Sequence, residues 1–199
     1  MTRKVQKIMR VRKPLILIGC EGKNKTETLY FSNFSSKECR IKFASGNSTD
    51  PTTMLSDIIK YMQKEDISKE LGDKIFLLID TDLSEKRIKE IESLENIATK
   101  YGIEIITSSP TFEIWFLMHF KTSAIIFNSS GDVKKALKKY IKSYKENMNI
   151  YNEIVSKTYK AIENAKKQEK SFIEKSLIYH NPHSTVYKII ETINTMNKK

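Results

Sequence analysis

The sequence predicts an α/β protein built on a four-stranded, mostly parallel sheet with helices on both faces. Segments of strand length alternate four times with segments of helical periodicity over residues 1–122. Two strand segments, 15–19 and 74–79, each contain a continuous apolar run, 15–18 and 75–79, which is typical of strands buried on both faces of a parallel sheet. This alternation favours right-handed crossovers. Residues 123–199 are predicted to form a helical C-terminal region packed on the α/β core.

Particular residues in the sequence predict where several helices begin and end. Asp50 before Pro51 predicts a helix start, because Asp can accept first-turn amide hydrogens and Pro fits the first helical position. Ser84 is predicted to cap the next helix and Gly102 to end it. The remaining strands are expected at 40–43 and 103–107. Beyond Thr122 we expect an edge strand at 124–127 and helices at 132–148, 151–175 and 184–197.

The amino-acid composition limits the kind of protein that this chain can be. Hydrophobic residues make up 39% and charged residues 30% of the chain, which is globular and not disordered composition. No apolar run approaches the roughly 20 residues of a membrane span, and the N-terminus does not resemble a signal peptide, so we expect a cytoplasmic protein without a membrane partner. Cys20 and Cys39 have no paired Cys or His spacing and are expected to be reduced thiols.

The formal charge of +11 predicts a polyanionic partner, since basic surfaces gain affinity by neutralising phosphates. Residues 1–13 carry six basic groups and no acid. A second group of lysines recurs at helical spacing and would form one stripe able to contact an RNA or DNA backbone. Its members are Lys134, Lys135, Lys138, Lys139, Lys142 and Lys145. Solvated lysine faces on ordinary helices are the alternative.

Acidic residues follow two of the predicted strands. Glu21 comes after 15–19, and Asp80 and Asp82 come directly after 74–79. Because the carboxyl ends of parallel strands meet at one edge, where open α/β proteins bind ligands, we expect these carboxylates to lie close together. Three ionised carboxylates would repel one another unless a cation compensated them. Mg²⁺, or Mn²⁺ in its place, is the expected cation because it takes hard oxygen ligands.

Glu113 is a further acidic candidate. It lies at the start of the helix predicted from 112 to 120, just after the strand at 103–107, and therefore reaches the same edge. Its charge suits the positive end of a helix. Ordinary capping explains it equally well, so a role in the site remains open.

Other residues of reactive type have simpler interpretations. The aromatic residues within 112–116 could stack on bases, but their helical spacing in an apolar stretch favours core packing. His119 lies in the same stretch and is expected to be a buried histidine. His180 and His183 flank Pro182 and are expected to be loop residues.

Three blocks of sequence keep a common order along the chain. They are Ile16–Gly22 with Lys25-Thr26-Glu27 and Tyr30-Phe31, then Ser109–Phe120, and finally Asn181–Lys188. The second is similar to an Asn-Pro-x-Phe-Glu-x-Trp pattern and the third to an Asn-Pro-Ser-Thr pattern. Together they resemble the RloB-like family, a Toprim-related group often encoded beside an ATPase in bacterial defence loci.

The resemblance implies a Toprim fold, with Glu21 as the glutamate of the first strand and Asp80 and Asp82 as the two acids after the third. It also implies a metal-dependent nuclease that is the effector of an anti-phage abortive-infection system and works with an ATPase partner. The chain departs from the family pattern in three places without losing a carboxylate. The departures are a longer loop at 21–27, Thr81 where Arg is expected, and Ser109 in place of Asn.

The expected reaction is metal-assisted cleavage of a phosphodiester bond. Asp80 and Asp82 would hold Mg²⁺ against the phosphate, while Glu21 would help to coordinate it or move a proton. Lys25 would hold a phosphate oxygen. One alternative is an Asp-x-Asp transferase or phosphatase, although such phosphatases carry the motif after the first strand. The other is a non-catalytic regulatory or binding partner of the ATPase.

Overall fold

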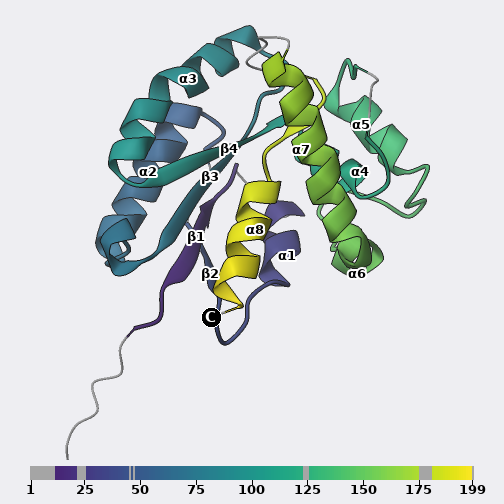
Figure 1. Cartoon of the computed structure of the whole chain (residues 1–199). Coiled ribbons are helices and arrows are strands. Elements are labelled where there is room, and N and C mark those ends of the chain that lie inside the picture. The colour runs from purple at the N-terminus through teal and green to yellow at the C-terminus, as the bar shows by residue number, and fades with distance from the viewer. Residues whose placement is uncertain are drawn as a thin grey trace, which may run out of the picture.

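The core of the protein is a five-stranded sheet in the order β2-β1-β3-β4-β5 (Figure 1). The computed structural model describes residues 12–21, 26–44, 46, 48–122, 126–174 and 181–198. The strands are β1 (Leu15–Gly19), β2 (Arg40–Phe43), β3 (Lys74–Asp80), β4 (Ile103–Ser109) and β5 (His183–Ser184). The first four are parallel, as the sequence predicts, and the sheet is broadly Rossmann-like.

The prediction of four strands is wrong because the C-terminal region supplies a fifth. β5 pairs antiparallel with the end of β4, and the pairing continues where Thr185 N donates to Thr107 O at 3.0 Å. A two-residue strand carries no detectable hydrophobic alternation, so its pairing could not be seen in the sequence. His183, predicted to be a loop residue, is accordingly buried in this strand.

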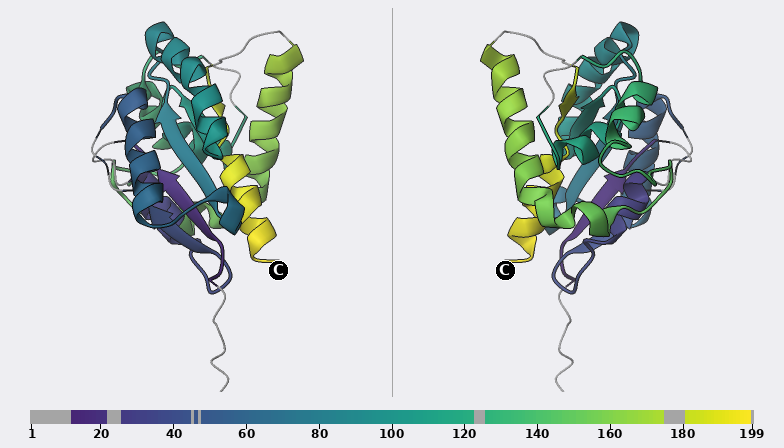
Figure 2. Two further views of the ribbon diagram at one scale, coloured as in Figure 1. Left: turned by 90° about the vertical axis from the view of Figure 1, so that its left-hand side faces the viewer. Right: turned by 90° about the vertical axis from the view of Figure 1, so that its right-hand side faces the viewer.

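Helices cover both faces of the sheet, as predicted (Figure 2). They are α1 (Thr26–Ser32), α2 (Pro51–Lys64), α3 (Glu85–Lys100), α4 (Glu113–Met118), α5 (Ser130–Leu137), α6 (Tyr151–Ile154), α7 (Thr158–Glu174) and α8 (Tyr187–Met196), with 3₁₀ turns at Lys69–Leu71 and Val155–Lys157. The helices α2 and α3 pack on one face. The other face is covered by α1 and α4 together with α5, α7 and α8. None of the described helices is long and apolar enough to cross a membrane.

The predicted helix ends are confirmed where the structure describes them. The Asp50 side chain accepts from Thr53 N at 2.9 Å at the start of α2. Ser84 Oγ accepts from Arg87 N at 3.3 Å at the start of α3. Gly102 adopts φ +70° just after α3, a conformation that favours glycine.

The long helix predicted at 132–148 is wrong, because α5 ends at Leu137 and the chain continues in turns to Ile150. Two effects oppose a longer helix. Lysines four residues apart, such as Lys134 and Lys138, repel one another along its surface. Ile141 and Tyr144 lie in the turn region and are buried in the main core. A straight continuation of α5 would not require both side chains to be buried there. The lysines therefore do not form one helical stripe.

The apolar face of the last helix closes the core. Ile189, Ile190 and Ile193 are at most 1% exposed in α8, so this face is not available to a partner. The edge strand expected at 124–127 falls partly on residues 123–125, which lie outside the described residues. At its end, Ile126 and Phe127 are not in a strand.

Asp73 fixes the start of the two central strands. Its buried carboxylate accepts from Leu15 N at 2.9 Å and from Ser68 N at 3.1 Å. Arg12 completes the set with two bonds of 2.9 and 3.0 Å. Arg12, one of the basic residues assigned to a polyanion partner, therefore has a structural ion pair.

We predict that Asp73→Ala lowers the free energy of unfolding by about 3–5 kcal/mol, because it leaves two backbone amide donors and the Arg12 cation without their shared acceptor. The matched change Arg12→Ala should cost about 1 kcal/mol or less, since Asp73 keeps both amide donors and Arg12 is partly exposed. Urea unfolding of the two variants measures the difference. Equal losses would show that the amide contacts do not fix the strands.

Candidate functional site

The predicted acidic residues lie at the point where the sheet changes direction. The chain leaves β1 for β2 on one side and returns past β1 to β3 on the other, so the switch point of the sheet lies between the carboxyl ends of β1 and β3. Glu21 lies two residues beyond β1, and Asp80 is the last residue of β3. The structure thus brings together residues 59 positions apart, with Glu21 Oε1 accepting from Asp80 N at 3.1 Å.

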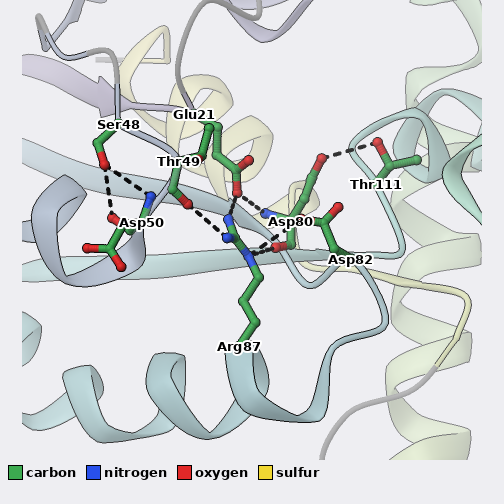
Figure 3. A network of polar contacts seen from close by, with 8 residues as sticks. All are labelled: Glu21, Ser48, Thr49, Asp50, Asp80, Asp82, Arg87 and Thr111. Atoms are coloured by element: carbon green, nitrogen blue, oxygen red, sulfur yellow. Dashed lines mark hydrogen bonds and ion pairs between the residues drawn. The ribbon is translucent and has the colours of Figure 1, made fainter.

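Arg87 is the central cation of this site (Figure 3). Its guanidinium donates to Glu21 Oε1, to Asp80 O at 2.5 Å and to Thr49 O at 2.8 Å. The same group lies 3.7 Å from Asp82 Oδ2. A guanidinium therefore occupies the position between Glu21 and Asp82 that the sequence assigned to a metal ion.

The turn after β3 separates the two aspartates. Asp82 and Leu83 have φ values of +49° and +57°, and two successive left-handed residues reverse the chain sharply. Asp82 N donates to Pro110 O at 3.2 Å, which ties the turn to the end of β4. The Asp82 side chain is 57% exposed, whereas Thr81 is fully buried. Asp82 therefore faces solvent and Arg87, while the Asp80 carboxyl group faces inward.

Asp80 is linked to Glu113 through one hydroxyl group. Thr111 Oγ1 lies 3.1 Å from Asp80 Oδ2 and 2.7 Å from Glu113 Oε2. A hydroxyl carries a single hydrogen, so it can satisfy both carboxyl groups only when one of them is protonated. Burial raises the pKa of Asp80 well above its usual range, and repulsion from Glu27, Glu21 and Glu113 raises it further. Burial therefore favours the protonated, neutral form of Asp80.

Glu113 belongs to the site and is not a plain helix cap. It is 4% exposed at the start of α4, and its Oε1 accepts from Tyr144 Oη at 2.8 Å. Lys134 Nζ lies 3.9 Å from the same oxygen and also pairs with Glu146. Thus α5 provides a cation, and the turns after it provide a donor, to an acid at the edge of the sheet.

Glu27 is a buried acid close to these groups. It lies in α1, is 4% exposed, and its Oε2 has no hydrogen-bond partner among the described residues. Burial raises the pKa of Glu27 to about 8, with repulsion from Glu113 and Glu21 adding to the effect. Burial also raises the pKa of Glu21, although the Arg87 charge opposes this.

These acids fit a divalent cation by their chemistry. Five carboxyl groups gather here, and the cations that contact them within the described part of the chain are Arg87 and Lys134. They are Glu21, Glu27, Asp80, Asp82 and Glu113. Within the same part, no three His, Cys, Asp or Glu side chains are arranged to hold a metal. Mg²⁺ needs only one or two carboxylates when a substrate phosphate and waters complete its shell, so Asp80 with Glu21 suffices.

The remaining candidates are distributed as follows. His119 is fully buried, and its Nδ1 lies 2.9 Å from Trp115 O. Burial lowers the pKa of His119 to about 4, so it is neutral at pH 7. Trp115 is fully buried, as are its aromatic neighbours in 112–116, which confirms the prediction of core packing. Lys25 and His180 lie outside the described residues.

The sequence did not reveal Arg87, Thr111 or Tyr144 as site residues. One feature of the sequence could have pointed to Arg87. Only five of the 35 basic residues are Arg, and this one lies a single turn past the helix cap Ser84. Thr111 lies two residues before Glu113 in the second family block. Tyr144 carried no signal, since it reaches the site from a turn region that was expected to be helical.

The fold and this acidic cluster define an α/β protein with a candidate catalytic site at the switch point of its sheet. A sequence model of the RloB-like protein family matches residues 16–193. The chain therefore belongs to the RloB-like protein family. No curated protein and no solved structure shows a significant match.

The raised pKa of Glu27 predicts a pH-dependent stability. A carboxyl group with a raised pKa favours folding fully below its unfolded pKa, and that contribution is lost as pH rises through about 8. We predict that Glu27→Gln increases the free energy of unfolding by on the order of 1–3 kcal/mol at pH 8, with little change at pH 4.5. Urea unfolding at both pH values in EDTA checks this. Glu92→Gln, an exposed change on α3, serves as the control; an equal gain at both pH values would contradict the assignment.

Proposed function

We propose that the protein is a Mg²⁺- or Mn²⁺-dependent nuclease of the Toprim type, which cleaves phosphodiester bonds in RNA or DNA. The observation that carries the proposal is the gathering of Glu21, Asp80 and Glu113 at the switch point of a parallel sheet, with more carboxyl groups than neighbouring cations. Such a cluster is costly for the fold, which indicates a role in binding a cation and substrate.

Asp80 and Glu21 would hold the metal ion, and Asp82 is exposed beside them to bind its water shell. A divalent ion here would polarise the phosphate and lower the pKa of bound water. Binding would release the proton that Asp80 holds, because a nearby cation favours the ionised carboxylate.

Arg87 would serve two roles in turn. Without substrate, its guanidinium neutralises Glu21 and holds the ends of β1 and β3 together. Its planar donors also match a phosphate group, which can accept two parallel hydrogen bonds. If a bound cation compensated Glu21, Arg87 would be free to bind a phosphate oxygen and to stabilise the charge that develops during cleavage.

The pair formed by Asp80 and Glu113 supports proton transfer. Thr111 connects the two carboxyl groups, and Tyr144 with Lys134 holds Glu113 on its other side. A proton released by Asp80 can therefore move through Thr111 to Glu113 without leaving the buried network. Glu113 would then donate a proton to the leaving oxygen as a general acid.

The lysines after α5 favour a nucleic-acid substrate. Lys135, Lys138, Lys139 and Lys142 are exposed, and Lys134 in the same segment reaches Glu113. Positive charge therefore borders the acidic site, which would guide a polyanion towards groups that alone would repel it. We further propose that an ATPase controls the nuclease in an anti-phage abortive-infection system, in keeping with the family to which the chain belongs.

The first test replaces the site acids. Asp80→Asn and Glu21→Gln should each lower metal-dependent cleavage by about 100-fold or more, because each removes a ligand charge. Asp80→Asn should not reduce stability in EDTA, since it replaces a buried acid, disfavoured in its ionised form by neighbouring acids, with a neutral side chain. Cleavage of mixed RNA and DNA with Mg²⁺ or Mn²⁺ is the measurement, and Glu92→Gln is the matched control. Activity of both variants equal to the parent would exclude this site.

The second test concerns the partner. We predict that the isolated chain cleaves weakly and that adding the product of an adjacent ATPase gene raises the rate, because an unregulated nuclease would be toxic. Co-purification followed by cleavage assays with and without the partner measures this. Full turnover by the pure chain, unchanged by the partner, would contradict it. Partner binding without cleavage under any metal would instead favour a regulatory role.

A further inference from the structure

A column of two aromatic rings and a lysine lies beside the acidic site. The rings of Phe120 and Tyr140 stack with centroids 4.7 Å apart and an interplanar angle of 14°. Lys157 Nζ lies 4.4 Å from the Phe120 centroid. Since Tyr140 covers one face of Phe120, Lys157 must occupy the other. The order is therefore ammonium, Phe120, Tyr140, and the column ends at the outer face of Tyr140.

The tyrosine at the end of this column is open to solvent. Tyr140 is 44% exposed, and in the described part of the chain its one ring contact is with Phe120. Because Phe120 covers the inner face of Tyr140 and is itself covered by Lys157 on its other side, the ring has a preferred orientation before any ligand arrives. A fixed aromatic surface of this kind can stack on a planar group at a small cost in side-chain entropy.

The charged residues of the chain segment that carries the ring are all basic. No acidic residue occurs from 133 to 145, and the lysines next to Tyr140 in the chain, Lys138 and Lys139, are exposed together with Lys142. Lysine charges around an exposed aromatic face are the combination that binds single-stranded nucleic acids, in which charge contacts the phosphates and the ring stacks on a base.

The position of the column relates it to the site. Phe120 lies two residues beyond the end of α4, the helix that begins with Glu113. Tyr140 lies between Lys134 and Tyr144, both of which contact Glu113. The helix α4 contacts both α5, which precedes Tyr140 in the chain, and α7, which begins just after Lys157. Tyr140 therefore belongs to the chain segment that also contacts Glu113.

We infer that the exposed face of Tyr140 is a stacking platform for an unpaired base of a single-stranded nucleic acid whose backbone runs over the lysines towards the acidic site. Bases in a duplex are already stacked and cannot occupy the platform. The preferred polymer is therefore single-stranded, which deepens the proposed function and rests on it for the identity of the substrate.

The test measures binding of fluorescent oligonucleotides of about 12 nucleotides to the full chain by anisotropy in EDTA, so that no cleavage occurs. Tyr140→Leu keeps an apolar cover on Phe120 but removes the aromatic face. We expect it to weaken single-strand binding about five-fold or more, with an unchanged salt slope and unchanged duplex binding. Tyr140→Phe and Tyr140→Trp should retain the affinity.

Two controls separate stacking from charge and from general damage. Tyr101→Leu removes a tyrosine with the same 44% exposure, located at the end of α3, and should change nothing. Abasic oligonucleotides keep the phosphates, so the parent should bind them about as weakly as Tyr140→Leu binds the normal strand. Lys138→Gln with Lys142→Gln should instead lower the salt slope for single and double strands alike.

The outcomes also distinguish this inference from the proposed function. If Tyr140→Leu binds single strands as tightly as the parent, or if the parent prefers duplex, the platform is excluded even when cleavage is observed. If the tyrosine-dependent preference for single strands is present but no metal supports cleavage, the platform stands and the nuclease assignment fails. An acidic protein bound in place of either polymer would overturn the inference.

Discussion

The ion pair between Glu21 and Arg87 connects the ends of the two central strands, and the rest of the site depends on it. One oxygen of Glu21 accepts from Arg87 and from Asp80 N, while Arg87 also donates to Asp80 O. The guanidinium therefore satisfies main-chain and side-chain groups of both strands at once. Its charge allows Glu21 to be buried next to other acids. Without this charge, repulsion among the carboxylates would destabilise the edge of the sheet.

The acidic site is formed by residues at the edge of the sheet together with residues of the chain after β4. The sheet delivers Glu21 and Asp80, but Glu113 is satisfied by Tyr144 from the turns after α5 and approached by Lys134 in α5 itself. β5 extends the same sheet from residues near the C-terminus. Residues beyond 122 are therefore part of the site's support, and the first 122 residues alone would leave a buried glutamate without its phenol donor.

Charge is distributed in a way that suits a polyanionic substrate and a buried cation. Carboxyl groups gather near the carboxyl ends of β1 and β3, where burial raises the pKa of Asp80 and of Glu27. Lysines occupy the exposed surface after α5. A polyanion would first meet the lysines, whereas the carboxyl groups become favourable for it only when a cation or protons compensate them. Because the lysines and the carboxyl groups are separated, binding of the polyanion and its cleavage would be distinct steps.

By itself the sequence determined the parallel sheet, the helices on both faces, and the presence of Glu21 and Asp80 at one edge, because apolar runs and caps are local signals. Tertiary structure alone decided that Arg87 lies between Glu21 and Asp82, that Thr111 joins Asp80 to Glu113, and that Tyr144 completes the set. It also ended α5 at Leu137 and added β5. These features depend on contacts between residues distant in the chain, whose free energy can override local propensity and leaves no periodic pattern.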